Sequence, residues 1–257
     1  MKYYPRTEKY DRKWISDNWM GPNPLWLLED LCEHLDLQPG MRVLDMGCGK
    51  GLTSVFLAKE YGVTVFANDL WISATDNLKR FEEAGVADKV FPIHAEAHAL
   101  PYAEGFFNAV LSIDSYHYFG ADEGYFPRIF SKLVEPGGQL GIVVPGLTRE
   151  FEKGYPDTME KFWNAYDGEL FAFHSGAWWR HLWEKTGIAK IIACYDIPDP
   201  KEIWMPWAVW SDENMPLLLK ECGFDADVNE AGSSDVDFLN ADTNNDIALV
   251  ALAARKK

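Results

Sequence analysis

The run MRVLDMGCGKG at residues 41–51 decides the fold of this chain. Its first part, MRVLDMG, is a short apolar run after the chain-breaking pair Pro39-Gly40, and it predicts a buried strand. Its second part is rich in glycine and leads into a helical pattern from Leu52 to Tyr61. A glycine turn between a strand and a helix lets a ligand touch the backbone while facing the helix N-terminus. The run therefore predicts an α/β fold that binds a nucleotide-like cofactor at this turn.

Short apolar runs alternate with amphipathic stretches over the first 145 residues, which is typical of strand–helix–strand winding. A helix is expected over 24–35, because Asn23 followed by Pro24 forms a helix cap with proline in the first turn. Further strands are expected at 63–70, 89–95, 107–114 and 139–146, and further helices at 72–84 and 122–134. This order predicts five parallel strands joined by helical crossovers.

The chain changes character after residue 146. Residues 147–210 hold seven of the 11 tryptophans, mixed with Pro, Gly and acidic residues. The final run, DIALVALAARKK at 246–257, is predicted to be a strand that closes the sheet at one edge. We expect a single domain made of four parts: an N-terminal cap segment (1–23), a cofactor-binding core (24–146), a substrate lid (147–210) and a C-terminal part of the sheet (211–257).

Composition and charge exclude several classes of protein. The 257 residues are 47% apolar, enough for a sizeable core, and the formal charge of −16 disfavours nucleic acid and anionic lipid as partners. No apolar run approaches the roughly 18 to 20 residues of a membrane helix, and the polar start lacks the apolar stretch of a signal peptide. Four widely spaced cysteines indicate neither a metal site nor a disulfide. We expect a cytoplasmic monomer or homodimer.

The spacing around the turn discriminates between cofactors. In the dinucleotide fingerprint G-x-G-x-x-G the third glycine would fall at position 52, which is Leu52 here, so a pyrophosphate is disfavoured. Asp69 ends the second predicted strand, about 20 residues after the turn, where an acid can accept both ribose hydroxyls. The alternative for Asp69 is that it only caps the following helix. An adenosine-containing cofactor is therefore the favoured ligand.

Five segments in order, VLDMGCGKG, ANDL, HAEAHALPY, SIDSYHYFG and LVEPGGQLGI, resemble successive motifs of the class I S-adenosylmethionine-dependent methyltransferases. The resemblance covers residues 20–146 and the final strand. It implies a Rossmann-like, doubly wound sheet of seven strands, six parallel and the last antiparallel, with an aromatic-rich helical insertion after the fifth strand. It also implies that S-adenosylmethionine lies across the carboxyl ends of the first strands.

The resemblance assigns residues to each part of the cofactor. They are Gly47, Gly49 and Gly51 with Asp45 for the methionine part, Asp69 for the ribose, Leu70 for the adenine face, Glu96 and Ala97 for the adenine amino group, and Ile113 with Asp114 near the sulfonium methyl. The cofactor carries a sulfonium and an ammonium, so this acidic set suits it electrostatically. Lys50, inside the turn, is expected to be a solvated lysine at the helix start.

Methyl transfer is an in-line displacement that depends mainly on alignment and on excluding water. His117, just beyond the fourth predicted strand, is the candidate base, and Asp114 is the candidate contact to cofactor or acceptor. The alternative is that His117 belongs to an aromatic packing cluster with Tyr116 and Tyr118.

Aromatic residues are the candidate acceptor contacts: Tyr116, Trp178, Trp179 and Trp19. The tryptophans of 147–210 either pack the insertion against the sheet or form an aromatic box for an amine. The leader at 1–23 is too apolar for a solvated tail and is expected to fold over the cofactor.

These observations together predict methyl transfer from S-adenosylmethionine to a small molecule, with an amine as one candidate. Two alternatives stay open. One is a Rossmann-type NAD(P)-binding oxidoreductase, which Leu52 and the absence of an evident Ser/Tyr/Lys set disfavour. The other is a protein that binds the cofactor without turnover. The sequence names neither the acceptor nor the atom that is methylated.

Overall fold

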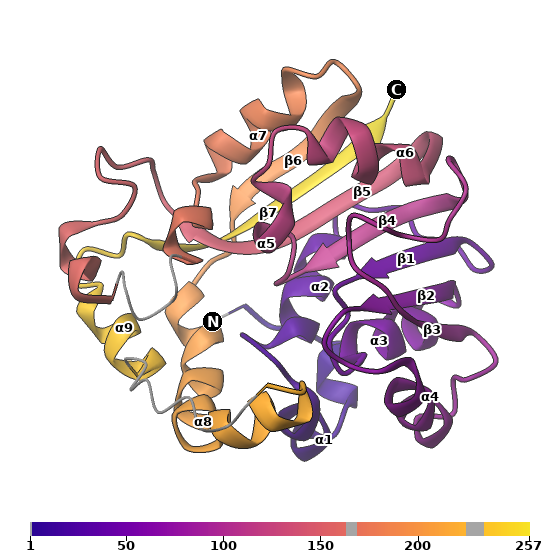
Figure 1. The fold of residues 1–257 in the computed structure, drawn as a ribbon, viewed down its shortest axis with the longest axis horizontal. Helices are drawn as coiled ribbons and strands as arrows, with labels where there is room; N and C mark the ends of the chain where they lie inside the picture. The colour runs from indigo at the N-terminus through magenta and orange to yellow at the C-terminus, as the bar shows by residue number, and fades with distance from the viewer. Residues whose placement is uncertain (1, 163–168, 225–233) are drawn as a thin grey trace.

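The computed structural model describes residues 2–162, 169–224 and 234–257 (Figure 1). Within these ranges, seven strands form one sheet in the order β3-β2-β1-β4-β5-β7-β6. The strands are β1 (Arg42–Met46), β2 (Thr64–Asp69), β3 (Val90–His94), β4 (Phe107–Ile113), β5 (Val134–Leu147), β6 (Ala189–Asp196) and β7 (Ile247–Lys256). Trp163, one of the tryptophans expected in the lid, lies outside the described residues.

The pairing confirms the predicted α/β class. Strands β1 to β5 pair in parallel, whereas β7 runs antiparallel to both β5 and β6, so six strands share one direction. The strand order reverses between β1 and β4. In sheets of this kind, ligands bind at the carboxyl ends of the strands where the order reverses. The glycine turn, which the sequence predicted to follow the first strand, lies at this switch point.

The prediction that the last strand closes an edge of the sheet is wrong. Strand β7 lies between β5 and β6, and its first eight residues are all buried, as expected of an interior strand covered on both faces. The edge strand on this side of the sheet is β6, where buried and more exposed positions are mixed. Since β6 comes from the segment expected to be a lid, part of that segment belongs to the sheet.

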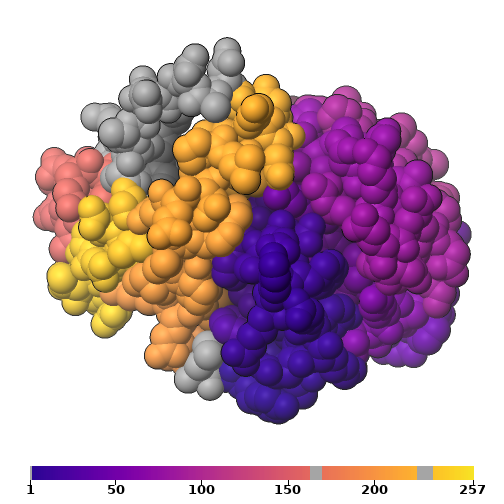
Figure 2. Space-filling model, turned by 90° about the horizontal axis from the view of Figure 1, so that it is seen from below, coloured from indigo at the N-terminus to yellow at the C-terminus, as the bar shows by residue number. Residues whose placement is uncertain are grey.

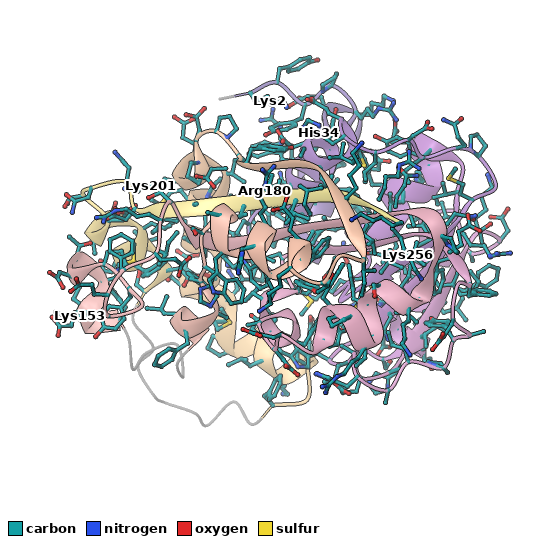
Figure 3. The ribbon with its side chains drawn as sticks, turned by 90° about the horizontal axis from the view of Figure 1, so that it is seen from above. Lys2, His34, Lys153, Arg180, Lys201 and Lys256 are labelled. Carbon is teal, nitrogen blue, oxygen red and sulfur yellow. The ribbon has the colours of Figure 1, made fainter. Side chains whose placement is uncertain are left out.

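Helices cover both faces of the sheet, and alternate strand residues enter two separate cores. Val43 packs in one core with α2 (Pro24–Cys32) and α3 (Leu52–Tyr61), whereas Leu44 packs in the other with α7 (Gly176–Glu184). Figure 3 shows α7, marked by Arg180, near the long strand β7, whose end is marked by Lys256. α4 (Ala74–Glu83) contacts β3.

The remaining elements differ more from expectation. Within the range 122–134, where one helix was expected, the structure has a π-helical turn η2 (Phe126–Phe130) followed by α6 (Ser131–Leu133). The short helix α5 (His117–Gly120) precedes this range. The others are η1 (Thr7–Lys9), α1 (Arg12–Asn18), η3 (Asp157–Phe162), η4 (Glu169–Ala172), α8 (Pro200–Glu221) and α9 (Asp235–Ala241). Among the described helices, none is long and apolar enough to cross a membrane.

The leader and α8 lie together at the carboxyl ends of the parallel strands. Figure 2 shows the leader in indigo, flanked by α8 in orange and by the first half of the chain in purple. Helix α8 crosses the expected boundary at residue 210, and β7 is the described part of 211–257 that joins the sheet. The leader and α8 therefore flank the glycine turn.

Candidate functional site

The turn between β1 and α3 presents bare backbone. Gly47 and Gly49 have φ angles of 71° and 54°, in the left-handed region that side chains disfavour. A Cβ on Gly47 would collide with the side chain of Ser115, and a Cβ on Gly49 would lie 3.0 Å from the Sδ atom of Met20. Backbone conformation and close neighbours therefore both demand glycine here.

Asp45 lies behind the turn and fixes the start of α3. Its carboxylate accepts hydrogen bonds from Thr53 Oγ1 and Ser54 Oγ, both at 2.6 Å. Burial raises the pKa of Asp45 to about 6. The side chain does not line the pocket in front of the turn, so its contribution to a ligand is through the position of the helix.

Asp69 connects the turn to the segment after β2. Its Oδ2 accepts from the Gly49 amide at 2.8 Å, and its Oδ1 accepts from the amides of Trp71 and Ile72 at 2.8 and 2.9 Å. Helix α4 is capped by Ser73, so the alternative that Asp69 caps this helix is wrong. Each carboxylate oxygen carries about two acceptor sites, so Oδ1 is filled by its two amides and Oδ2 keeps one site for a hydroxyl donor.

A pocket opens in front of the turn between the leader and the end of β4. Its walls are Asn18 and residues 20–22 of the leader, Pro24 at the start of α2, residues 47–50 with Leu52 and Thr53 around the turn, and Ile113 with Asp114. Asp114 has a φ of 57°, and its carboxylate lies so close to Gly21 that a Cβ there would collide with it. Of the predicted site residues, the structure brings Gly47, Gly49, Ile113 and Asp114 together at this pocket; Gly51 adjoins it as the N-cap of α3.

Lys50 is not the solvated lysine that the sequence suggested. It is buried, and its Nζ lies 2.6 Å from Glu221 Oε2 at the end of α8. The partner lies 171 positions further along the chain, so it could be found only from the fold. This ion pair ties the glycine turn to α8.

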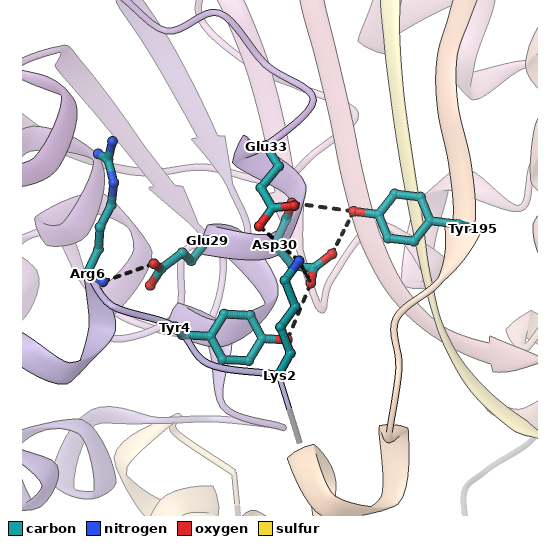
Figure 4. Close-up of polar contacts among 7 residues, drawn as sticks. All are labelled: Lys2, Tyr4, Arg6, Glu29, Asp30, Glu33 and Tyr195. Carbon is teal, nitrogen blue, oxygen red and sulfur yellow. Dashed lines mark hydrogen bonds and ion pairs between the residues drawn. The ribbon is translucent and has the colours of Figure 1, made fainter.

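The leader is anchored to α2 by buried carboxylates (Figure 4). Asp30 accepts from Lys2 Nζ at 2.8 Å, from Tyr4 OH at 3.3 Å and from Tyr195 OH at 2.6 Å. Glu29 accepts from the Arg6 amide at 2.9 Å and also from the following amide and hydroxyl. Since Tyr195 belongs to β6, one carboxylate joins the leader to the edge strand.

Trp19 anchors the other end of the leader. Its ring centroid lies 6.2 Å from that of Trp207 and 6.3 Å from that of Trp210, both on α8 and both steeply inclined to it. Met20 and Gly21 follow directly and form a wall of the pocket. The predicted acceptor contact Trp19 therefore packs against α8 beside the pocket.

The residues predicted for the adenine lie at the ends of β2 and β3. Leu70 is 51% exposed. Glu96 accepts from the His98 amide at 2.9 Å and pairs with His98 Nδ1 at 2.6 Å, which lowers its pKa. Ala97 is buried, and its carbonyl accepts from Tyr125 OH. These three flank the turn and do not line the pocket.

The structure does not bring the other predicted contacts to the pocket. Tyr116 and Trp179 are fully buried, with ring centroids 5.6 Å apart. Both side chains are part of the hydrophobic core. Trp178 stacks on His174 at 3.7 Å. His117 begins α5 and is 2% exposed, its ring 4.1 Å from that of Tyr118.

Met20 belongs to the leader that the sequence predicted to fold over the cofactor, and it lines the pocket. Sequence reasoning missed Gly21 and the Lys50–Glu221 pair. The run MGPNP at 20–24, dense in turn-forming residues before the first core helix, was the signal for Gly21. The pair had no such signal, because the pairing joins distant parts of the chain.

Comparison with known proteins gives a family match and several curated relatives. Residues 43–138 match a family model described as a methyltransferase domain. Methyltransferase GfsG from Streptomyces halstedii is 29% identical over 54% of this chain and 55% of its own length. Phosphoethanolamine N-methyltransferase 1 from Zea mays is 24% identical over 72% of this chain and 35% of its own. The chain thus spans about half the length, or less, of these curated relatives.

Solved structures share the fold over most of the chain. A putative sarcosine dimethylglycine methyltransferase from Galdieria sulphuraria matches 90% of this chain and 83% of its own, with a TM-score of 0.69 and 17% identity. Phosphoethanolamine N-methyltransferase 2 from Haemonchus contortus, solved with S-adenosyl-L-methionine, matches 95% of this chain and 55% of its own, with a TM-score of 0.69 and 19% identity. The chain therefore has the Rossmann-like fold of these methyltransferase structures.

Proposed function

We propose that this chain, a member of the class I methyltransferase family, binds S-adenosylmethionine at the β1–α3 turn and transfers its methyl group to a small molecule. One observation carries the proposal: leader, turn and the end of β4 enclose a pocket that combines bare backbone with the carboxylate of Asp114. The family match over residues 43–138 supports it.

The residues present fit this cofactor. The cofactor supplies a methyl group on a sulfonium, and a sulfonium with an ammonium is attracted to an acidic pocket. Gly47 and Gly49 line the pocket with backbone atoms, and the remaining acceptor site on Asp69 Oδ2 suits a ribose hydroxyl. Leu70, Glu96 and Ala97 flank the turn on the side proposed for adenine.

The chain's own residues act mainly by orientation and by excluding water. The leader covers the turn with Met20 and Gly21, and the ion pair of Lys50 with Glu221 holds α8 against it. Asp114, which lines the pocket, is the titratable side chain proposed to face the reacting groups. His117 is buried and does not line the pocket, so it is the weaker of the two candidates for a proton acceptor. A dinucleotide-dependent oxidoreductase is not favoured, since the family match and Leu52 both argue against it.

Two measurements test the proposal. Calorimetric titration should show saturable binding of S-adenosylmethionine and S-adenosylhomocysteine and none of NAD. Incubation with methyl-labelled cofactor and a metabolite extract should yield a labelled product that mass spectrometry identifies. Failure to bind either compound at millimolar concentration would refute the proposed function; binding without any labelled product would favour a protein that binds the cofactor without turnover.

A further inference from the structure

Three large exposed aromatic side chains at the edge of the site form a cluster in which the middle one contacts the other two. Trp71, Tyr118 and Phe224 are 42%, 53% and 45% exposed. The ring centroid of Trp71 lies 5.7 Å from that of Tyr118 and 5.8 Å from that of Phe224, at interplanar angles of 63° and 82°. We call these three residues the aromatic rim. A contiguous apolar patch of this kind commonly marks a binding surface.

The aromatic rim stands beside the pocket because each member follows a site residue closely. Trp71 is two positions after Asp69, and its amide donates to that carboxylate. Tyr118 is four positions after Asp114, and Phe224 is three positions after Glu221, the partner of Lys50. Three separate segments thus bring aromatic rings to the carboxyl edge of the sheet, where ligands of such folds bind.

The charges around the pocket restrict the chemistry of what could dock there. Among the described residues that line the pocket, Lys50 is the cation, and its ammonium is already paired with Glu221 at 2.6 Å. The other charged lining residue is Asp114, an anion. A phosphate needs cationic donors such as arginine or lysine, whereas neutral rings and chains need apolar surface. The pocket wall and the aromatic rim together favour an acceptor without a phosphate.

We propose that the aromatic rim is the docking surface for the apolar body of the methyl acceptor, and that this acceptor carries an aromatic ring or an extended apolar chain and no phosphate group. The inference rests on the proposed function and adds the substrate class to it. Rings inclined at steep angles leave aromatic faces and edges available to a further ring, the arrangement that aromatic pairs prefer. The chain would then differ from relatives named for phosphoethanolamine.

The test uses the full chain saturated with S-adenosylhomocysteine and two probes, 1-naphthol and phosphoethanolamine. The expected result is saturable binding of 1-naphthol that weakens at least tenfold in Trp71→Ala and in Tyr118→Ala. The matched control is Phe91→Ala, since Phe91 on β3 is also 42% exposed but contacts Phe66 and not the aromatic rim. Phosphoethanolamine should not compete, and the affinity of every variant for S-adenosylhomocysteine should stay within twofold.

Each other outcome has a defined meaning. No saturable binding of 1-naphthol to the wild-type complex, equal losses in Phe91→Ala, or competition by phosphoethanolamine would each overturn the inference. A tenfold loss of S-adenosylhomocysteine affinity in Trp71→Ala and Tyr118→Ala, with unchanged melting temperature, would assign the aromatic rim to the cofactor instead. Failure of the wild-type chain to bind S-adenosylhomocysteine would refute the proposed function itself. Should Trp71→Ala fail to fold, Tyr118→Ala alone decides.

Discussion

Replacing Asp30 with asparagine should loosen the leader and, through it, weaken cofactor binding. The side chain is 1% exposed and accepts from Lys2, Tyr4 and Tyr195. Asparagine keeps the shape and one acceptor oxygen but turns the other position into a donor that faces these donors. The substitution therefore removes the charge and reverses part of the hydrogen bonding at an interior site.

The expected magnitude follows from these contacts. A hydrogen bond to a charged group contributes about 1.5–3 kcal/mol, and a buried ion pair that loses one partner costs about 3–5 kcal/mol. Because Lys2 is 31% exposed and the bond from Tyr4 is long, we expect the lower end, about 3 kcal/mol. For a chain of this length that corresponds to a fall in melting temperature of roughly 6–12 °C.

The leader forms one wall of the pocket, so the affinity for the cofactor should fall when the leader is docked in fewer molecules. If the leader is docked in only a fraction of molecules, the apparent Kd rises by the inverse of that fraction, here expected to be about 3- to 10-fold for S-adenosylhomocysteine. Calorimetric titration measures the Kd and scanning calorimetry the melting temperature.

The matched control is Glu33→Gln, which removes another carboxylate paired with Lys2, at 2.9 Å, but one that is 57% exposed. It should cost less than about 1 kcal/mol. An Asp30→Asn protein that melts lower yet binds with unchanged Kd would refute the coupling of the anchor to the pocket.

Three further substitutions test the site. Gly49→Ala should weaken S-adenosylhomocysteine binding more than Gly40→Ala, because both have positive φ but only the former meets Met20; equal Kd values would contradict this. Burial raises the pKa of Asp45 from 3.8 to about 6, so the folded chain keeps a proton that the unfolded chain releases between these values. Stability should therefore fall by up to about 3 kcal/mol as the pH rises through this window. Measured by urea unfolding at several pH values, the Asp45→Asn variant should lack this fall in stability, whereas the control Asp17→Asn should keep it. If stability depends on pH in the same way in wild type and Asp45→Asn, the reasoning about Asp45 is refuted. Glu221→Gln leaves the Lys50 ammonium buried without its carboxylate and should cost about 1–2 kcal/mol, whereas Glu104→Gln, from the exposed pair with Lys132, should cost almost nothing in the same assay; equal costs would rule out a role for burial.

Local pattern was enough to predict the cofactor half of the fold. The glycine turn and the apolar runs at 41–47, 63–70 and 107–114 each carry their own signal, since strand and turn preferences act over a few residues. The structure has β1, β2 and β4 within these ranges, and α3 begins and ends where the helical pattern does.

Contacts between distant segments explain what the sequence could not predict. The helical pattern of the tryptophans was visible, but whether Trp179 faced a ligand or the core depended on which side of the sheet α7 packs. Likewise β7 has the composition of any buried strand. Its local sequence does not indicate that β6 pairs with it on the side opposite to β5. Lys50 shows the same limit, because a lysine beside a glycine turn is usually solvated unless another element supplies an acid.

The placement of β7 has a consequence for the site. Asp30 holds the leader together with Tyr195 of β6, and β6 is held in the sheet by its pairing with β7. Strand β7 contributes no residue to the pocket wall, yet the edge strand that completes the leader's anchor depends on it. The cofactor pocket is thus built from the first half of the chain and closed by contacts that form only when the last strand is in place.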